Sequence, residues 1–422
     1  MKILVLSNLY PPDFIGGYEL CCRQIVDGLL GRGHNVRVLT APPRVPCVSP
    51  GHVSRQLELV NCFDRHGLIH ARPIPRELLY ARAAFANAHN VHLLSEALAD
   101  FQPDVVYLWH LYGLGGLGLL AALQYMGVPW LWCLEDSVPR KLCSLEHGEP
   151  PELTAAFSRF ARGSYMAVSQ RVVDEVEAAG IELRDEVEIM PNWILGERPP
   201  DRATFYQPGE HLRIVSSGYI GRHKGTHLLV EAAALLRDRG HQNFSIDLIG
   251  KLGEPAIHTL AQQLGVEPWV KFLGAWSQAD LPRHYEQTRY DVFAFPTWER
   301  EPFGCAPMEA GAYGAAMVMT QSCGVGEWFV DGVHCLKTAR TAAAFADTFE
   351  KILTGQIDLE PIARRGTDVI WRDFRIDALL PRIERALERA ASRPCSPAGP
   401  SDEAYRLALL AEKLVAVLIQ EW

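Results

Sequence analysis

The chain of 422 residues lacks any apolar run that approaches the roughly 18 residues of a membrane-spanning helix. The apolar segment after Met1 is also too short for the core of a secretory signal peptide, so we expect a cytoplasmic protein with no transmembrane segment. The ten cysteines form no C-x-x-C pair and no zinc-type spacing, which favours reduced thiols over a metal site. A net charge of −9 argues against binding to nucleic acid or anionic lipid.

Short apolar segments typical of β-strands alternate with longer helical patterns, and this order begins again after residue 210. Such alternation predicts parallel sheets with crossover helices, and its repetition predicts an α/β protein with two Rossmann-like domains. The expected strands are 3–7, 35–40, 104–109 and 129–134 in the first half, and 213–217, 243–250, 270–273 and 291–296 in the second, with helices at 19–32, 114–126 and 225–239.

A segment rich in proline and glycine, 192–209, is the best candidate for the link between the two domains. We therefore expect an N-terminal domain over 1–196, a C-terminal domain over 197–375, and helices over 376–422. Within that last part, the pattern over 402–421 places leucines on one stripe of a helix, which suits either packing on the N-terminal domain or pairing with a second copy in a homodimer.

One glycine motif points to a different class of enzyme. Gly113, Gly115 and Gly118 form a G-x-G-x-x-G after a strand, and Glu135 and Asp136 follow where a ribose-binding acid would be sought. An NAD-dependent oxidoreductase is therefore an alternative. The motif is weak, because several strand and helix segments precede it and because close packing of a helix on a sheet also explains the glycines.

Two other glycine-rich turns follow the first strand of each expected domain. Gly16 and Gly17 precede a helix in the first domain, where backbone amides and a helix N-terminus favour an anion. In the second domain, Gly218 begins a turn that contains Arg222 and Lys224 and leads into a helix. Fixed positive charge at a helix N-terminus predicts a site for a diphosphate, although a plain solvated turn would also fit.

The most specific element runs from Trp298 to Ala310, after the last expected strand, and contains Glu301 and Glu309. Pro302 disfavours helix at Glu301, whereas Pro307 is tolerated only in a first helical turn. Glu301 should therefore lie on a loop and Glu309 in the helix that follows. Two acids separated in this way could bind different parts of an extended ligand.

With this element the sequence resembles the retaining nucleotide-sugar glycosyltransferases of family four, which have the GT-B fold. The resemblance rests on E-P-F-G at 301–304 and the E-x7-E spacing, and it extends over roughly 1–375. It implies two Rossmann-like domains that face each other across a cleft, with C-terminal helices that return to the N-terminal domain. Further matching segments are 16–17, 32–36, 167–169, 190–192, 224–225 and 324–332.

The resemblance also implies roles for single residues. Glu309 corresponds to the acid that binds the ribose, and Glu301 to the acid that faces the donor sugar. The amides of Phe303 and Gly304 would lie near that sugar, and Lys224 at the diphosphate. The implied reaction moves a sugar from a UDP-, GDP-, dTDP- or ADP-sugar to a hydroxyl acceptor with retention and without a metal ion, and no two aspartates form a D-x-D.

Two departures from the family's pattern bear on substrate and mechanism. Tyr219 stands where many relatives have a basic residue, so Arg222 is a candidate for the missing charge. Glu135 stands where the family has a histidine near the sugar, and we include it among the candidate catalytic residues. These departures keep a noncatalytic nucleotide-sugar-binding relative as an alternative. A nucleotide-sugar epimerase, a second enzyme class on a similar fold, is another, although E-P-F-G with E-x7-E belongs to the transferase pattern. We expect the acceptor to bind loops of the N-terminal domain after Pro12 and over 54–82.

Overall fold

The computed structural model describes the chain except for residues 15, 45, 61–80, 145–153, 156, 158–159, 161–162, 184–186, 278–279, 299 and 394–422. The chain divides into two compact units. The first comprises Met1–Met190 together with the described residues from Leu379 onward, and the second comprises Pro191–Ala378. Each unit is built on one parallel sheet, as the alternation of apolar and helical segments predicts.

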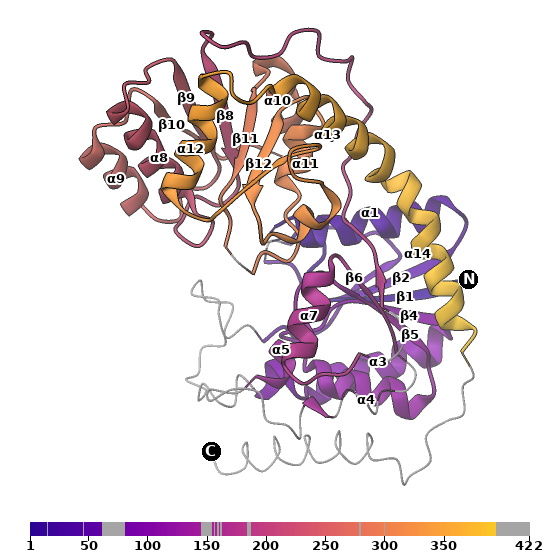
Figure 1. Cartoon of the computed structure of the whole chain (residues 1–422). Helices are drawn as coiled ribbons and strands as arrows, with labels where there is room; N and C mark the ends of the chain where they lie inside the picture. The colour runs from indigo at the N-terminus through magenta and orange to yellow at the C-terminus, as the bar shows by residue number, and fades with distance from the viewer. Residues whose placement is uncertain are drawn as a thin grey trace. The chain divides into compact units, whose positions relative to one another are not determined.

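The first unit contains a seven-stranded sheet in the order β3-β2-β1-β4-β5-β6-β7. Its strands are apolar nearly throughout, as expected for parallel strands covered on both faces. Figure 1 shows α1 on one face of this sheet and α3 and α4 on the other. The elements are β1 (Lys2–Ser7), α1 (Gly17–Gly31), β2 (Asn35–Thr40), β3 (Val53–Arg55), α3 (Ala88–Phe101), β4 (Val105–His110), α4 (Gly116–Met126), β5 (Trp130–Leu134), α5 (Val138–Cys143), β6 (Gly163–Ala167), α7 (Gln170–Ala178) and β7 (Glu188–Ile189).

The second unit contains a six-stranded sheet in the order β10-β9-β8-β11-β12-β13. Helices α8, α9 and α12 cover one face of it, and α11 and α13 cover the other (Figure 1). The elements are β8 (Leu212–Ser217), α8 (Thr226–Asp238), β9 (Phe244–Ile249), α9 (Ala256–Leu264), β10 (Val270–Gly274), α10 (Asp280–Thr288), β11 (Val292–Phe295), α11 (Ala306–Gly311), β12 (Ala316–Thr320), a 3-10 helix (Gly324–Trp328), β13 (Leu336–Thr338), α12 (Ala342–Leu353) and α13 (Leu359–Asp373).

Both sheets have a topological switch point, where the strand order reverses. In the first unit the chain leaves β1 toward β2 and later returns to place β4 on the other side of β1. In the second unit, β8 pairs with β9 on one side and with β11 on the other. Ligands of open α/β sheets bind beyond the carboxyl ends of the strands at such points. The loops after β1, β4, β8 and β11 are therefore the places to look for a site.

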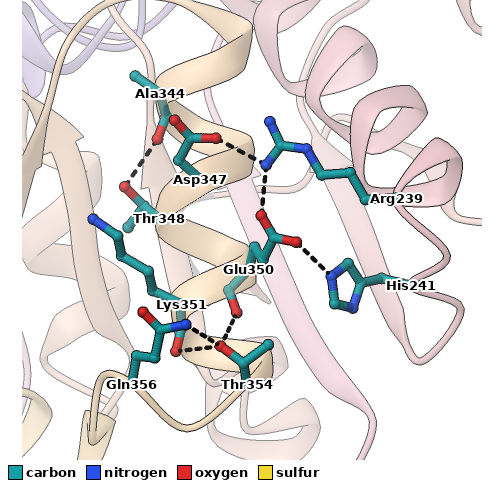
Figure 2. Close-up of polar contacts among 9 residues, drawn as sticks. All are labelled: Arg239, His241, Ala344, Asp347, Thr348, Glu350, Lys351, Thr354 and Gln356. Atoms are coloured by element: carbon teal, nitrogen blue, oxygen red, sulfur yellow. Dashed lines mark hydrogen bonds and ion pairs between the residues drawn. The ribbon is translucent and has the colours of Figure 1, made fainter.

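Polar contacts join the end of α8 to α12 (Figure 2). Since α8 begins at the loop after β8, its other end lies away from these loops. Arg239, which ends α8, is 2.8 Å from carboxylate oxygens of both Asp347 and Glu350 in α12. His241 Nε2 lies 3.0 Å from the other oxygen of Glu350. The hydrogen bond to His241, supported by Arg239, lowers the pKa of Glu350. This network fixes one end of α8.

Helix α14 (Ile376–Ala391) packs on the first unit beside α1, with Leu380 directly against Gly28. Polar contacts add to this packing at the carboxyl end of α1. Arg32 Nε donates to Glu384 Oε2 over 2.9 Å, and His34 Nε2 lies 2.6 Å from Glu384 Oε1. The hydrogen bonds from Arg32 and then His34 lower the pKa of Glu384. The predicted leucine stripe over 402–421 lies outside the described residues, as does most of the expected acceptor segment 54–82.

Within the part of the chain that the structure describes, no helix has the length and apolarity to cross a bilayer. The cysteines described there are all free, and most of them are buried. Buried thiols of this kind behave as small apolar side chains.

Candidate active site

The loops after β8 and β11 meet at the switch point of the second unit. Gly225 ends the first loop with φ +73°, and a Cβ there would lie 1.8 Å from the carbonyl oxygen of Pro296 in the second loop. Only glycine permits both this conformation and this approach. Because Lys224 precedes Gly225, the contact places the lysine next to the loop that carries Glu301.

Lys224 and Glu301 form an ion pair at this place. The Nζ of Lys224 donates to Glu301 Oε2 over 2.5 Å, and the hydroxyl of Thr297 donates to the same oxygen over 2.6 Å. Glu301 is buried, with only 8% of its surface exposed. Burying a carboxylate is costly unless hydrogen-bonding or cationic partners of this kind contact it. Glu301 lies on a loop, as Pro302 predicts, because α11 begins only at Ala306.

The segment that follows Glu301 is held by the turn before the 3-10 helix. The amide of Gly324 donates to the carbonyl of Glu301 over 3.1 Å, and that of Val325 to the carbonyl of Phe303 over 2.9 Å. Gly304 has φ +91°, and a Cβ there would lie 2.6 Å from the ring of Phe295. In the described part of the chain, the amides of Phe303 and Gly304 donate no hydrogen bond. Both amides thus remain available to a ligand.

Glu309 lies in the first turn of α11, the position expected from Pro307. Its side chain is half-buried, and desolvation raises its pKa above the ordinary value. Nearby, the hydroxyl of the buried Tyr285 donates to Ser217 Oγ at the end of β8 over 2.9 Å. Burial and the charge of Glu309 both raise the pKa of Tyr285. Among the described residues, no ionic partner lowers the pKa of Glu309, and desolvation alone accounts for its rise.

A surface groove of about 230 Å³ opens beside the carboxyl end of β10. Trp276, 42% exposed, lines it and lies over the ring of His284 at 4.3 Å between centroids. His284 Nε2 in turn lies 3.0 Å from the hydroxyl of Tyr290, and burial lowers the pKa of His284. An exposed tryptophan on a rigid support offers a flat apolar surface on which an aromatic ring can stack.

Tyr219 and Arg222, in the same turn after β8, do not contact Glu301 as Lys224 does. Tyr219 is 42% exposed, and its ring lies across Gly253, where a Cβ would fall 1.8 Å from the tyrosine oxygen. Gly250 also lies close to this turn, since a Cβ at Gly250 would fall 1.6 Å from the carbonyl oxygen of Gly218. Arg222 donates its amide to Glu254 over 3.0 Å, and its exposed side chain has no hydrogen bond or ion pair among the described residues. The structure thus brings Lys224 to Glu301 but leaves Arg222 at the surface.

In the first unit, Gly16 precedes α1 and Gly17 begins it, both exposed. The amide of Gly16 already donates to the carboxylate of Glu19 over 3.2 Å. An anion at this helix N-terminus would have to displace a negative side chain from the amide. The anion site predicted from these glycines therefore has one donor engaged within the chain.

The carboxyl ends of β4 and β5 gather a second set of ionisable groups. Glu135 is buried directly after β5, and the thiol of Cys133 lies 3.6 Å from it. Asp136 accepts a hydrogen bond from the Ser137 amide and forms an ion pair with Lys141. Although burial acts in the opposite direction, Lys141 lowers the pKa of Asp136.

Two aromatic rings lie beside these acids. Burial, together with the charges of Glu135 and Asp136, raises the pKa of Tyr18. The Tyr18 ring is 5.0 Å from that of His110 at the end of β4. Burial and Lys141 lower the pKa of His110 to about 4, so this imidazole is neutral at pH 7. Glu135 thus lies in a compact polar cluster at the switch point of the first unit.

The glycines of the G-x-G-x-x-G motif serve packing. A Cβ at Gly115 would lie 2.3 Å from the backbone nitrogen of Asn87, and one at Gly113 would lie 2.6 Å from the side chain of Leu59. The amides of Gly113 and Gly115 both donate to the carbonyl of Ala83, and the amide of Gly118 donates to that of Phe85. Atoms of the chain fill the space that a dinucleotide would need, and the amides that would bind it already donate to carbonyls of the chain. The motif therefore no longer supports the oxidoreductase alternative.

Three residues of the second unit could not be predicted from the sequence: Thr297, Arg340 and Trp276. The hydroxyl of Thr297 binds Glu301 within the same loop, Arg340 binds carbonyls in two other loops, and neither residue belongs to a local pattern that indicates a ligand. Trp276 follows the carboxyl end of a predicted strand, and this position is the feature of the sequence that could have indicated a ligand site there. No group of three or more metal-binding side chains occurs among the described residues.

The sequence profile described as "Glycosyl transferase 4-like domain" matches residues 16–193, and that described as "Glycosyl transferases group 1" matches residues 197–368. A D-inositol 3-phosphate glycosyltransferase of Arthrobacter sp. is 26% identical over 80% of this chain and 82% of the relative. A glycosyltransferase of Methanocaldococcus jannaschii is 23% identical over 78% of this chain and 82% of the relative.

Solved structures show the same fold. A sucrose-phosphate synthase from Thermosynechococcus elongatus superposes with a TM-score of 0.69 at 17% identity, covering 92% of this chain and 98% of that chain. HepE of Anabaena in complex with UDP superposes with a TM-score of 0.66 at 18% identity, covering 92% of this chain and 100% of that chain.

Two Rossmann-like units, each built on a parallel sheet, define the GT-B fold that these solved structures share. The two family profiles together extend over most of the chain. The protein is a glycosyltransferase, with one half similar to the glycosyl transferase 4-like domain and the other to glycosyl transferases group 1. The expected fold class and enzyme class are thereby confirmed.

Proposed function

We propose that the enzyme transfers a sugar from a nucleoside diphosphate sugar to a hydroxyl acceptor, with retention of configuration and without a metal ion. The observation that carries the proposal is the Lys224–Glu301 pair, at 2.5 Å, where α8 begins. A lysine at a helix N-terminus suits a diphosphate, and a buried carboxylate beside it suits the hydroxyls of a sugar attached to that diphosphate. Retention is inferred from the E-x7-E resemblance.

The second unit offers a partner for each part of such a donor. We assign the diphosphate to Lys224 and to the turn from Gly218 through Tyr219, with Arg222 as a second cation once its exposed side chain turns inward. The ribose is assigned to Glu309. The sugar is assigned to Glu301 and to the amides of Phe303 and Gly304, which no described group occupies. The groove at Trp276 offers a stacking surface for the base.

We assign the acceptor to the first unit, in the region predicted as 1–196. Glu135 is buried near Tyr18 and a neutral His110 at the ends of β4 and β5. An acid at this place can accept a hydrogen bond from an acceptor hydroxyl and orient it. The glycine turn at Gly16–Gly17 lies after the neighbouring strand β1 and would contribute backbone contacts once Glu19 releases the Gly16 amide.

The leaving diphosphate must be stabilised as the bond to the sugar breaks. Lys224 and the N-terminus of α8 supply fixed positive charge, which requires no reorganisation when charge develops. In this mechanism the leaving phosphate helps to deprotonate the acceptor, as the family resemblance implies. The protein's contribution is then to position the two substrates and to hold the charge.

The proposal is tested first by binding and then by turnover. UDP, GDP, dTDP and ADP are screened by thermal shift, since a nucleotide at 100 times its dissociation constant stabilises the fold by about 2.7 kcal/mol. Sugar nucleotides that contain the nucleotide found to bind are then incubated with hydroxyl acceptors in the presence of EDTA. The anomeric configuration of the product is determined by NMR. An inverted product refutes retention. Binding without turnover would favour the noncatalytic alternative, and absence of binding refutes the proposal.

A further inference from the structure

Arg340 joins the two loops that carry the candidate donor site. It follows β13 and precedes α12, and its side chain is only partly exposed. Its Nε donates to the carbonyl of Thr297 over 2.8 Å, and one Nη donates to the carbonyls of Arg222 and His223 over 3.1 and 3.3 Å. One guanidinium thus binds three backbone oxygens from segments that are more than 70 residues apart in sequence.

Each of these carbonyls is next to a residue of the site. His223 immediately precedes Lys224, whose ammonium binds Glu301. The hydroxyl of Thr297 binds the same oxygen of Glu301 over 2.6 Å. Arg340 therefore holds the backbone on both sides of the Lys224–Glu301 pair, although it contacts neither of these side chains through the hydrogen bonds described.

The chemistry of arginine suits this task. Its planar fork presents several donors in fixed directions, whereas lysine offers a point charge on a flexible chain. A cation beside these carbonyls also offsets negative dipoles near the place proposed for a diphosphate. The same charge reaches the neighbouring imidazole: burial, Lys224 and then Arg340 lower the pKa of His223.

We propose that Arg340 is a positioning residue for the donor diphosphate. It holds the turn at 222–224 and the loop at 297–301 in register, so that Lys224 and Glu301 meet the diphosphate and its sugar together. This inference rests on the proposed function of the second unit. It assigns a role to a residue that belongs to neither the E-x7-E element nor the lysine turn.

Arg340→Gln removes the charge and most of the fork, and Arg340→Lys keeps the charge alone. Arg239→Gln is the matched control, because Arg239 fixes α8 through Asp347 and Glu350 (Figure 2), at the opposite end of the helix from Lys224. Calorimetry measures the affinity for whichever of UDP, GDP, dTDP and ADP binds the wild type most tightly, and for the matching nucleoside. The kcat and KM for the corresponding sugar nucleotide are measured alongside.

We expect Arg340→Gln to weaken nucleoside diphosphate binding by about 10- to 100-fold and to lower kcat, with nucleoside affinity changed by less than about twofold. Arg340→Lys should restore part of the loss, and Arg239→Gln should change neither affinity. Equal diphosphate affinity in Arg340→Gln and Arg239→Gln overturns the inference while the proposed function stands. Equal losses for diphosphate and nucleoside would show a general structural role and also overturn it. If none of the four nucleotides binds the wild type, both proposals fail.

Discussion

Lys224 and Glu301 are 77 positions apart in sequence, and the ammonium of one lies 2.5 Å from the carboxylate of the other. The unliganded chain thus holds the cation of its candidate diphosphate site paired with the acid of its candidate sugar site. A donor that binds both must exchange this contact for contacts of its own. The acid should therefore oppose the binding of a free diphosphate while it favours the reaction of a complete donor.

Replacing Glu301 with Gln should separate binding from turnover. The amide keeps the shape and can still accept a hydrogen bond from Thr297, but it no longer neutralises Lys224. We expect unchanged or tighter binding of the free nucleoside diphosphate, and a loss in kcat of about 10² to 10³, the scale of a lost transition-state contact. Glu350→Gln is the control, since Glu350 belongs to the α8–α12 network in Figure 2. A wild-type kcat in Glu301→Gln would refute the assignment.

Replacing Glu309 with Gln should weaken nucleotide binding by about 1.5 to 3 kcal/mol, the value of a hydrogen bond to a charged group. Because burial raises the pKa of Glu309, its ionised form destabilises the folded chain above the ordinary carboxyl pKa. The same variant should therefore unfold at a higher temperature than the unliganded wild type at pH 7 to 8.

Acidification should remove that gain in stability, because the wild-type carboxyl is protonated in the folded and unfolded chain at low pH. The affinity of the wild type for the nucleotide should also fall as the pH is lowered, because protonation removes the carboxylate that accepts hydrogen bonds from the ribose hydroxyls. Calorimetry across pH 4 to 8 on both proteins measures the two effects. Equal nucleotide affinity of wild type and Glu309→Gln at pH 7.5 would exclude Glu309 from the ribose site.

Alanine at Gly225 should destabilise the second unit far more than alanine at Gly240. The two glycines flank α8, and both have positive φ, +73° and +90°. A Cβ at Gly225 would lie 1.8 Å from the Pro296 carbonyl, whereas one at Gly240 meets no atom within 4 Å. Strain alone costs about 1 to 3 kcal/mol, and the added overlap should cost about 2 kcal/mol more. Urea unfolding of both variants measures the difference, and equal losses would contradict the close approach of the two loops.

The contact between Glu384 and α1 should make stability depend on pH. Hydrogen bonds from Arg32 and His34 lower the pKa of Glu384, so the stabilisation is present above the ordinary carboxyl pKa and is lost as the pH falls through the lowered value. Glu384→Gln should therefore reduce the free energy of unfolding slightly at pH 7 and not at pH 3. The same deficit at both pH values would mean that packing of α14, rather than the charge, is responsible.

Much of the fold could be predicted because parallel strands buried on both faces are nearly continuous apolar runs. The strand predicted over 213–217 is β8, which begins at Leu212, and that predicted over 291–296 is β11, at Val292–Phe295. The loop position of Glu301 followed from Pro302, and the helical position of Glu309 from Pro307, because proline restricts its own and its neighbour's backbone.

The pairings around the site could not be predicted in the same way. Arg340 binds the carbonyls of Arg222, His223 and Thr297. Because every residue has a backbone carbonyl, no pattern of side chains in the sequence predicts these contacts. The exposed position of the Arg222 side chain depends on the tertiary path of the turn, which local spacing does not determine. The motif at Gly113–Gly118 likewise matches the pattern of a dinucleotide-binding loop. Its amides, however, donate to the carbonyls of Ala83 and Phe85, and the sequence gives no sign of these contacts.

The central claim is that Lys224 in the second unit binds the diphosphate of a sugar nucleotide whose sugar is transferred. Its most direct test is the rate of nucleoside diphosphate release from the sugar nucleotide in EDTA, with acceptor present, for wild type, Lys224→Ala and Arg222→Ala. The account predicts release by the wild type and a loss of about 10² to 10³ in kcat for Lys224→Ala. It also predicts a loss for Arg222→Ala, because the Arg222 side chain is assigned to the diphosphate as the second cation. Wild-type release by Lys224→Ala would contradict the account.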